Sequence, residues 1–348
     1  MSGNGFRLAV DAANLVRDRR GMGRLARAVL AEAFADPSIR VTLLAVKSGD
    51  ARALRLEFPK ADVRWPISAS SRRAYDAVWF PFNGMRFPSG PRSLVTIHDV
   101  FAFTEAHPDR IARFREQAPI ARAAAKATRI LTDSHWSRDE IERVLDVAPE
   151  RIDVIVPSPD AYWFPAPGDA VPAPLAGRKY ALLVGVRERR KNARTALEAC
   201  ARAFRGTDTL AIVGELAPED RARALQLRLP CGEISASDAL LRALYRNAAA
   251  VLVPSFAEGF GLVAVEALAC GAPVIAANAT ALPEACDGAA WLLDPRDTAG
   301  WSQAIRDLFD NGERASSLRI QAASRFATSD RTRAGRETLA LLRSMGSR

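Results

Sequence analysis

Short apolar runs alternate with longer stretches of helical pattern along the whole chain. The runs have the length of strands, and we predict strands at 8–10, 41–46, 77–79, 94–97, 129–132, 180–184, 210–213, 250–253 and 273–276. Helices are predicted near 22–35, 110–127, 137–147, 192–204, 237–248, 261–270 and 298–312, with a last helix within 328–344. Strands that alternate with helices favour parallel sheets covered by helices on both faces.

A cluster of prolines divides this alternation in two, and it comprises Pro157, Pro159, Pro165, Pro167, Pro172 and Pro174. So many prolines cannot continue a helix or a central strand. A chain of 348 residues is long enough for two domains. We therefore predict an α/β protein of two doubly wound, Rossmann-like parallel-sheet domains that face each other across a cleft. The domains cover 1–160 and 178–327, with a linker at 161–177 and a C-terminal helix at 328–348.

The formal net charge of +9 comes mainly from arginine. Such a balance suits an anionic membrane surface, a phosphorylated ligand or a nucleic acid. The simpler alternative is that arginines line solvated helix faces, and we slightly favour it. The sequence has no signature of an RNA- or DNA-binding module, so we do not expect a nucleic-acid partner.

The cysteines and histidines do not indicate a metal site. Cys200, Cys231, Cys270 and Cys286 are widely spaced, which is typical of buried small residues in a reducing compartment rather than of disulfides or zinc ligands. The three histidines are equally scattered. We recognise no signal peptide and no membrane-spanning run, and we expect a cytoplasmic protein.

The stretch from Glu258 to Glu266 is the strongest chemical signal. It places two carboxylates on either side of a Gly-x-Gly turn, directly after the apolar run at 249–253. A strand followed by a loop and a helix is where open α/β sheets bind ligands. Gly259 and Gly261 leave backbone N–H groups open beside the positive end of the helix dipole. Two acceptors that flank exposed donors suit a polyhydroxylated ligand with phosphates, and a nucleotide sugar is the obvious candidate.

Two other readings of this stretch are weaker. Glutamates in a first helical turn are common partners of the helix dipole. Residues 259–264 also match the G-x-G-x-x-A pattern of dinucleotide-binding proteins. That pattern begins directly at the strand end and has an acid after the next strand, whereas here residues 254–258 intervene and the next strand runs into Asn278. We therefore do not favour a dehydrogenase.

A second candidate loop follows the strand at 180–184. Gly185 is followed there by Arg187, Arg189, Arg190 and Lys191, just before a predicted helix. Such a glycine turn with basic side chains is a plausible diphosphate site, although a solvated basic loop is an equal alternative on this evidence alone. Since both loops follow strands of the same predicted domain, together they favour the functional reading.

The first half offers weaker signals. Gly21 and Gly23 open a predicted helix, where glycines let a backbone approach a phosphate or a sugar closely, but an ordinary loop is just as consistent. His98 and Asp99 end a predicted buried strand. A histidine in that position could polarise a hydroxyl, or it could be a satisfied structural residue.

These residues together resemble glycosyltransferases of family 4, which have the two-domain GT-B fold. The most specific part is Val253-Pro-Ser-Phe-Ala-Glu-Gly-Phe-Gly-Leu-Val-Ala-Val-Glu-Ala-Leu-Ala-Cys-Gly-Ala-Pro-Val274, which is similar to the family's P-S-x-x-E-G-F-G-L…E-A-x-A-x-G-x-P-V signature. Residues 191–192, 282–295, 21–23 and the strand ending at His98 also resemble family members. The departures are Val263 and Arg189, where relatives often have proline, and Val186, where some use a phosphate-binding arginine.

The resemblance implies a role for each motif in a donor-binding second domain and an acceptor-binding first domain. Glu266 would hold the ribose hydroxyls of the nucleotide, and Glu258 would hold hydroxyls of the transferred sugar. Lys191 would neutralise the leaving diphosphate. His98 would line the donor sugar. The remaining donor-binding candidates are Gly185, Arg187, Arg190, Ser255, Gly259, Phe260, Gly261, Leu262, Gly21 and Gly23.

By the same resemblance the protein is a retaining hexosyltransferase that uses a nucleotide-diphosphate sugar, such as a UDP- or GDP-sugar. The acceptor is expected to be a glycan or a lipid-linked sugar in cell-surface polysaccharide synthesis, with peripheral contact at an anionic inner membrane as a further expectation. The chain has no Asp-x-Asp pair, so we expect neither a metal nor another cofactor. A nucleotide-sugar epimerase of the same fold and an inactive sugar-binding paralogue remain the alternatives.

Overall fold

The computed structural model describes residues 5–18, 21–65, 75–87, 92–105, 107–159, 161–164, 175–327, 330 and 332–346. The chain forms two compact units. Unit 1 comprises Met1–Ser158 together with Asp330–Arg348, and unit 2 comprises Pro159–Ser329.

Unit 1 is built on a seven-stranded parallel sheet with the strand order β3-β2-β1-β4-β5-β6-β7. The strands are β1 (Phe6–Asp11), β2 (Ile39–Leu44), β3 (Asp62–Arg64), β4 (Ala77–Phe80), β5 (Ser93–Thr96), β6 (Arg129–Thr132) and β7 (Ile152–Val154). The helices are α1 (Met22–Ala35), α2 (Ser48–Glu57), α3 (Phe101–Thr104), α4 (Arg110–Lys126), α5 (His135–Leu145) and α13 (Arg333–Gly346), with a 3-10 turn at Pro149–Arg151.

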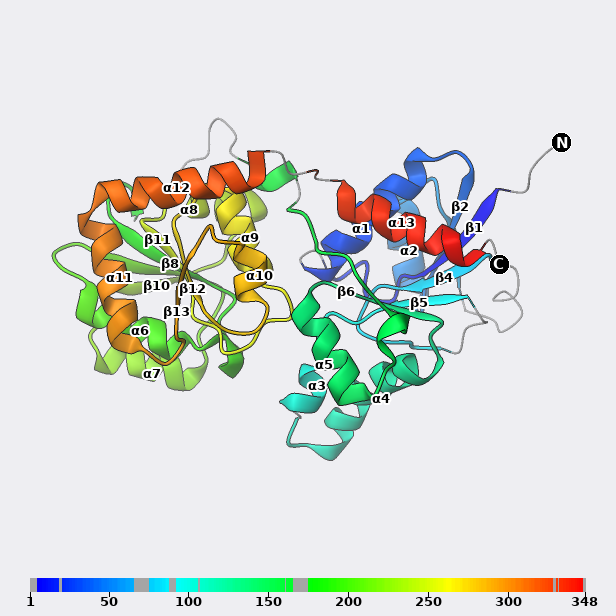
Figure 1. Cartoon of the computed structure of the whole chain (residues 1–348), viewed down its shortest axis with the longest axis horizontal. Helices are drawn as coiled ribbons and strands as arrows, with labels where there is room; N and C mark the ends of the chain where they lie inside the picture. The colour runs from blue at the N-terminus through cyan, green and yellow to red at the C-terminus, as the bar shows by residue number, and fades with distance from the viewer. Residues whose placement is uncertain are drawn as a thin grey trace. The chain divides into compact units, whose positions relative to one another are not determined.

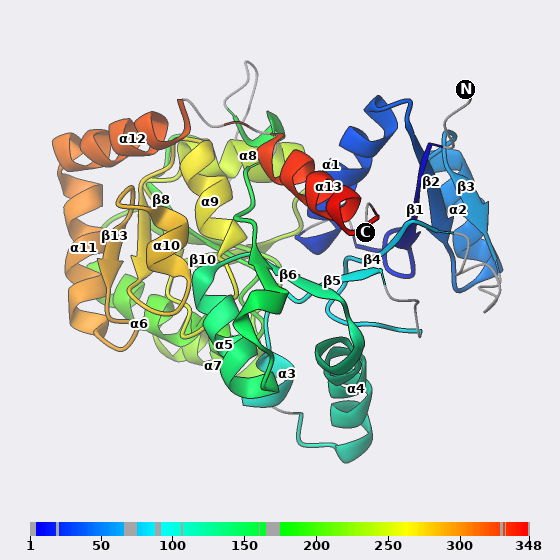
Figure 2. The ribbon, with the colours of Figure 1, turned by 45° about the vertical axis from the view of Figure 1, so that its right-hand side comes forward.

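Helix α13 is the last element of the chain, yet it belongs to unit 1. It lies beside α1 in both overall views (Figure 1, Figure 2). Leu339 and Leu342 of α13 are buried in one hydrophobic cluster with Val29 of α1 and Trp79 of β4. Gly335 allows the close approach, because a Cβ at that position would come within 3.1 Å of the carbonyl oxygen of Ala28. The chain therefore returns to the first unit to complete its core.

Unit 2 is built on a six-stranded parallel sheet with the order β10-β9-β8-β11-β12-β13. Its strands are β8 (Tyr180–Val184), β9 (Thr209–Val213), β10 (Cys231–Ile234), β11 (Ala250–Val253), β12 (Val274–Ala277) and β13 (Trp291–Leu293). Its helices are α6 (Ala193–Ala203), α7 (Pro218–Gln226), α8 (Asp238–Asn247), α9 (Leu262–Ala269), α10 (Leu282–Cys286), α11 (Thr298–Asp310) and α12 (Gly312–Ala327). Short 3-10 turns lie at Ala161–Trp163 and Arg189–Lys191. The helices surround the sheet (Figure 1).

The nine predicted strands are all present, and they are the interior strands of the two sheets. The four strands that the sequence pattern missed are β3, β7, β10 and β13, which are the edges of the sheets. An interior parallel strand is covered on both faces and has a continuous apolar run, as in β8. The edge strands are less buried: three of the four residues of β10 are exposed, and the short apolar β13 is only partly buried.

The edge position of β10 also corrects one sequence-based expectation. Cys200, Cys270 and Cys286 are buried free thiols, as predicted, but Cys231 is exposed. Cys231 begins β10, so it faces solvent at the side of the sheet that no further strand covers.

The segment predicted as a linker begins inside unit 2. Trp163 is fully buried there, and its ring packs edge-on against Tyr245 at a centroid distance of 5.7 Å. Its carbonyl oxygen accepts a hydrogen bond from the thiol of Cys270. Pro165, Pro167, Pro172 and Pro174 lie outside the described residues.

Candidate active site

In both sheets the strand order reverses once, and the reversal places two loops side by side. In unit 2 the reversal falls between β8 and β11. The loop after β8 contains the predicted basic turn, and the loop after β11 contains the predicted Glu258 segment. A crevice outside the carboxyl ends of the strands at such a point is the usual ligand site of open α/β sheets. Two motifs that lie 67 residues apart in sequence are thus brought together, as the contact between Lys191 and Glu258 confirms.

Asn192 joins the loops around this point. Its backbone is left-handed, with φ 53° and ψ 46°, a conformation that asparagine tolerates better than most residues. Its side-chain amide donates to the carbonyl oxygens of Pro254 and Pro295, both at 2.9 Å. Its amide oxygen accepts from the hydroxyl of Thr195 at 3.0 Å. The loops after β8, β11 and β13 are therefore held by one buried side chain.

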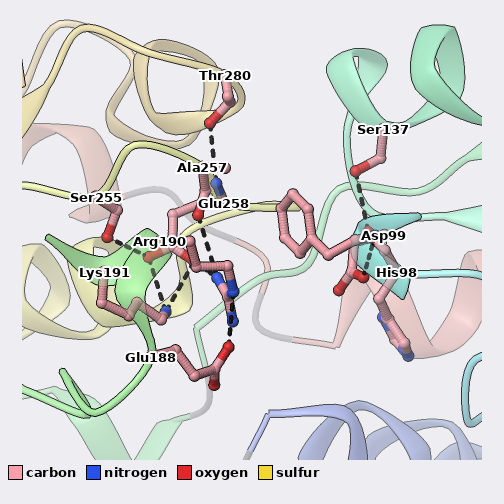
Figure 3. A network of polar contacts seen from close by, with 11 residues as sticks. His98, Asp99, Ser137, Glu188, Arg190, Lys191, Ser255, Ala257, Glu258 and Thr280 are labelled. Atoms are coloured by element: carbon pink, nitrogen blue, oxygen red, sulfur yellow. Dashed lines mark hydrogen bonds and ion pairs between the residues drawn. The ribbon is translucent and has the colours of Figure 1, made fainter. Parts of the chain in front are cut away.

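Glu258 lies at the centre of a buried polar cluster (Figure 3). Its carboxylate accepts from Lys191 Nζ at 2.8 and 2.9 Å, from Arg190 at 3.2 Å and from the hydroxyl of Ser255 at 2.7 Å. Its backbone N–H donates to the hydroxyl of Thr280 at 3.0 Å. A buried carboxylate needs such partners, because taking an unpaired charge out of water costs several kcal/mol.

Glu266 lies one turn inside α9 and is only partly buried. Its carboxylate accepts from the hydroxyl of Tyr245 at 3.4 Å. Gly261 caps α9 with φ 105°, and a Cβ there would come within 2.7 Å of the side chain of Leu282. A glycine is therefore required both by the backbone and by the space. The turn at Gly261 lies between Glu266 and the cluster of Glu258 and Lys191. The loop and the helix therefore carry two separate carboxylate acceptors.

The other predicted residues of unit 2 fall into two groups. Gly185 is exposed at the end of β8 with φ 65°, where its N–H donates to the carbonyl oxygen of Val213. Arg187 forms an exposed ion pair with Glu215 at 3.2 Å. Phe260, in contrast, is 5% exposed, so its side chain belongs to the core and only its backbone N–H is a candidate ligand contact. Gly259 and Leu262 are partly exposed on either side of this ring.

In unit 1, Gly21 and Gly23 lie at the start of α1, where the structure shows why glycines are needed. Gly23 lies within α1, and a Cβ there would come 1.9 Å from the carbonyl oxygen of Asp18. The guanidinium of Arg27 donates to the carbonyl oxygens of Leu15, Asp18 and Gly23. Gly21 caps the helix with φ 48° and no side-chain hydrogen bond. The loop is thus closely packed, and Arg20 beside it lies outside the described residues.

His98 is buried after β5 and uses both ring nitrogens. Nδ1 is bonded to the carboxylate of Asp133, and Nε2 to the carbonyl oxygen of Pro81 at 3.0 Å. Burial by itself lowers the pKa of this imidazole, but the Asp133 carboxylate and the Pro81 carbonyl raise it to about 9. The ring is therefore protonated at neutral pH and donates from both nitrogens. Its backbone N–H also donates to the side chain of Asn83 at 2.7 Å.

The contacts of His98 hold the loop after β4, and this loop brings Arg86 to Asp11. Asp11 ends β1, next to β4, where the order of the unit 1 sheet reverses. It is 1% exposed, and Arg86 Nε lies 3.6 Å from its Oδ2. Arg122 donates to the carbonyl oxygens of Met85 and Arg86 at 3.1 Å and fixes the loop from the other side. Burial raises the pKa of Asp11 to about 6, although the N–H of Ala13 and the charge of Arg86 oppose the shift.

Sequence reasoning did not identify Asp133, Asn83 or the pair of Asp11 and Arg86. Asp133 directly follows β6, and His98 lies two residues beyond β5, so the strand-end position of Asp133 could have identified it. Arg86 lies six residues beyond β4 in a loop with no recognisable pattern. Nothing in the local sequence indicates that it reaches Asp11.

No group of His, Cys, Asp and Glu in the described part of the chain is arranged to hold a metal ion. None of the described helices has the length and apolar character that crossing a bilayer needs.

Comparison with known proteins connects unit 2 to a family. Residues 178–311 match the family model described as glycosyl transferases group 1. The chain is 32% identical over 235 residues to the O-antigen chain mannosyltransferase B of Escherichia coli. That match covers 62% of this chain, and the chain spans only 60% of the length of this relative.

Solved structures extend the likeness to both units. Sucrose-phosphate synthase from Thermosynechococcus elongatus matches with a TM-score of 0.75 at 18% identity, over 98% of this chain and 99% of that one. HepE of Anabaena in complex with UDP and glucose matches with a TM-score of 0.75 at 16% identity, over 98% of this chain and 100% of that one. At these identities the likeness shows the fold, which is GT-B with two Rossmann-like parallel-sheet units, as predicted.

The protonated state of His98 can be tested by its effect on stability. Its folded pKa of about 9 lies above the ordinary value of 6.5. The stabilisation is therefore complete below pH 6.5 and is lost as the pH rises through about 9, with an upper limit of about 3 kcal/mol. We expect the difference in free energy of unfolding between wild type and His98→Gln, measured in urea, to shrink between pH 6.5 and 9.5. The exposed His107→Gln is the control. A difference that does not change with pH would contradict the assignment.

Proposed function

We propose that this chain, whose residues 178–311 form a glycosyl transferases group 1 domain, is a retaining hexosyltransferase that uses a nucleotide-diphosphate sugar. The observation that carries the proposal is the cluster of Glu258, Lys191 and Arg190 at the strand-order reversal of unit 2, with Glu266 one helical turn away. The complex of HepE with UDP and glucose supports a donor of this class. The acceptor would be a glycan or a lipid-linked sugar, as the O-antigen mannosyltransferase relative suggests.

The two glutamates would divide the donor between them. Glu266 is partly exposed one turn inside α9, so its carboxylate can accept from the vicinal hydroxyls of a ribose. Glu258 would accept from hydroxyls of the transferred sugar. A carboxylate has about four acceptor positions, and four hydrogen bonds already occupy those of Glu258. A sugar hydroxyl must therefore replace one of these donors.

Lys191 is the donor best suited to leave. It makes two of the four bonds, and its flexible chain can turn its ammonium group toward a nearby phosphate. Sugar binding at Glu258 would thus release Lys191 to the leaving diphosphate, where a positive charge stabilises the developing negative charge. Arg190 keeps its partners Glu188 and the carbonyl oxygen of Ala257, so it would stay in place. This exchange couples recognition of the sugar to activation of the leaving group.

The chemistry would then follow from the charges of the protein alone, with no metal. Retention of the anomeric configuration would arise by front-face displacement, in which the leaving phosphate assists the attacking hydroxyl. Gly185, Arg187, Ser255, Gly259 and Leu262 would complete the donor site from the same two loops. His98, whose ring nitrogens are both bonded, would act through the loop that it holds rather than through proton transfer.

Two alternatives remain distinct from this proposal. A nucleotide-sugar epimerase of the same fold would convert the donor without any acceptor, and an inactive paralogue would bind the donor without turnover. The cluster around Glu258 and Lys191 favours an active enzyme, because four hydrogen bonds hold it in position at the strand-order reversal.

We also propose that the protein is cytoplasmic and contacts the anionic face of the inner membrane peripherally. Arg17, Arg52 and Arg55 of unit 1 are exposed and Arg24 is partly exposed, whereas Arg19, Arg20, Arg72 and Arg73 lie outside the described residues. Helix α4 adds apolar contacts, since Ile111 and Phe114 are 63% and 70% exposed on it. Arg110 and Arg115 of the same helix are exposed as well, and basic residues together with exposed apolar residues suit an interfacial position on a bilayer.

The division between the glutamates predicts two different binding defects. Glu266→Gln should weaken the binding of UDP or GDP, whereas Glu258→Gln should leave nucleotide affinity intact and weaken the binding of the sugar nucleotide. Each change removes a charged acceptor worth roughly 1.5–3 kcal/mol, or about 10- to 150-fold in affinity. Calorimetry with UDP, GDP, UDP-glucose and GDP-mannose measures both effects, with Glu198→Gln on α6 as the control. Unchanged affinities and turnover in both variants would refute the assignment.

The proposed leaving-group stabilisation predicts that activity does not need a divalent cation. Lys191, Arg190 and the N-terminus of the helix after the β8 loop would replace it. Release of the nucleoside diphosphate should continue at the same rate in excess EDTA. Loss of that release in EDTA, with recovery on adding manganese or magnesium, would be incompatible with this mechanism.

The membrane proposal predicts binding to anionic vesicles. Co-sedimentation should be strong with anionic liposomes, weak with neutral ones and lost at high salt, because each basic residue contributes about 1 kcal/mol and the attraction is screened. Ile111→Ser with Phe114→Ser should weaken the binding, whereas Leu225→Ser on the exposed face of unit 2 should not. Equal binding to both kinds of vesicle would contradict the proposal and would mean that the positive charge has no role in membrane contact.

A further inference from the structure

A second group of side chains lies at the same sheet edge as Glu258 but takes no part in its cluster. The loop after β13 contains Pro295 and Arg296, and the loop after β11 contains Phe256. Asn192 binds the carbonyl oxygens of Pro254 and Pro295, so these two loops are tied to each other. As a result the guanidinium carbon of Arg296 lies 5.2 Å from the centre of the Phe256 ring.

Phe256 is unusual among the aromatic residues of unit 2 because it is 38% exposed. Its position is nevertheless well defined, since its backbone N–H donates to the carbonyl oxygen of Arg190 at 2.7 Å. Glu258 follows it by two residues. The backbone of Phe256 is therefore held at the rim of the proposed donor site, where the ring exposes an apolar surface.

Two arginines at this sheet edge, Arg296 and Arg189, form no ion pair within the described residues. Both side chains are exposed. Their neighbours differ: Arg190 is bound to Glu188 and Glu258, and Arg187 to Glu215. Arg189 immediately precedes Arg190, whose carbonyl oxygen binds the N–H of Phe256. The turn that contains Arg189 is therefore bonded to the backbone of Phe256, and the guanidinium of Arg296 lies over the exposed ring.

An exposed ring and a guanidinium group together recognise a specific kind of molecule. The apolar C–H face of a sugar packs well on an aromatic ring, and a guanidinium group binds a phosphate or a carboxylate through paired hydrogen bonds. A neutral sugar would use only the ring, and inorganic phosphate only the arginines. A ligand that uses both is a sugar with an anionic substituent.

We propose that Phe256, Arg296 and Arg189 form a subsite for a monosaccharide unit that bears a phosphate or a carboxylate, and that this unit belongs to the acceptor. The assignment to the acceptor rests on the proposed glycosyltransferase function, because Glu258 and Lys191 beside it are assigned to the donor. The subsite selects anionic acceptors by the charge at its rim.

The test measures binding of simple probes to the full-length chain in the presence of excess UDP, which occupies the donor site. The probes are glucose 6-phosphate, glucuronate, glucose and inorganic phosphate, measured by calorimetry or ligand-detected NMR. We expect glucose 6-phosphate or glucuronate to bind more tightly than both glucose and phosphate. Arg296→Gln should weaken this binding about ten-fold or more, Arg189→Gln should weaken it less, and Phe256→Leu should remove the advantage over phosphate.

Arg314→Gln is the matched control, because its guanidinium carbon also lies over an aromatic ring of unit 2, at 3.9 Å from the centre of Trp291. Trp291 begins β13, at the opposite end of that strand from Arg296. This variant should bind the probes like the wild type. UDP affinity should be unchanged in Arg296→Gln and Phe256→Leu, which also confirms that these variants are folded.

Several results would overturn the inference. Wild type that binds no anionic sugar, or binds it no better than inorganic phosphate, would remove the subsite. An equal loss of probe affinity in Arg314→Gln would show that the binding site is not at Phe256 and Arg296. A parallel loss of UDP affinity in Arg296→Gln would assign the arginines to the donor diphosphate and leave the proposed function intact. Failure of the wild type to bind any nucleotide would instead refute the proposed function. Titration with UDP alone measures that binding separately from the probes.

Discussion

The candidate site of unit 2 depends on the side chain of Asn192. Three loops leave the carboxyl edge of the sheet after β8, β11 and β13, and a short loop has no hydrophobic core of its own to hold it. The buried amide of Asn192 binds one carbonyl oxygen from each of the latter two loops and lies itself in the first. Its left-handed backbone turns the chain directly into α6. Since buried carbonyl groups are costly without a donor, the clamp is strongly favoured once the sheet has formed.

This clamp explains why a cluster of charges can be stable where it is. Lys191 precedes Asn192, and Glu258 follows Pro254 by four residues, so the clamp fixes the backbones of both partners before their side chains meet. A salt bridge that must order its own backbone contributes little, whereas one whose backbone is already ordered loses less entropy. A fixed backbone also limits the reorganisation that electrostatic stabilisation of a leaving group must avoid, because in the proposed exchange only the side chain of Lys191 has to turn.

The parts of the fold that the sequence predicted are those with a strong local signal. Every interior strand has an apolar run, and the Gly-x-Gly turn between Glu258 and Glu266 marks a tight strand–loop–helix connection. The edge strands β3, β7 and β10 each contain a charged residue, and the apolar β13 is only three residues long and is partly buried. The sequence also did not predict that α13 returns to unit 1. Its pattern of apolar residues indicates that the helix packs on a core, but it does not indicate which unit contains that core.

The candidate site shows the same limit at the level of single residues. A position at a strand end was enough to select His98, Lys191 and Glu258, because parallel sheets place these ends at one edge. The partners of each residue come from elsewhere in the chain: Asp133 is 35 residues from His98, and Lys191 is 67 residues from Glu258. For Lys191 the partner is the carboxylate of Glu258, which in the proposed mechanism is exchanged for a phosphate of the donor. For His98 the partners are a buried carboxylate and a carbonyl oxygen that keep the ring charged and fully bonded, so the ring holds the loop after β4. The same sequence signal therefore has two chemical meanings, and only the long-range contacts separate them.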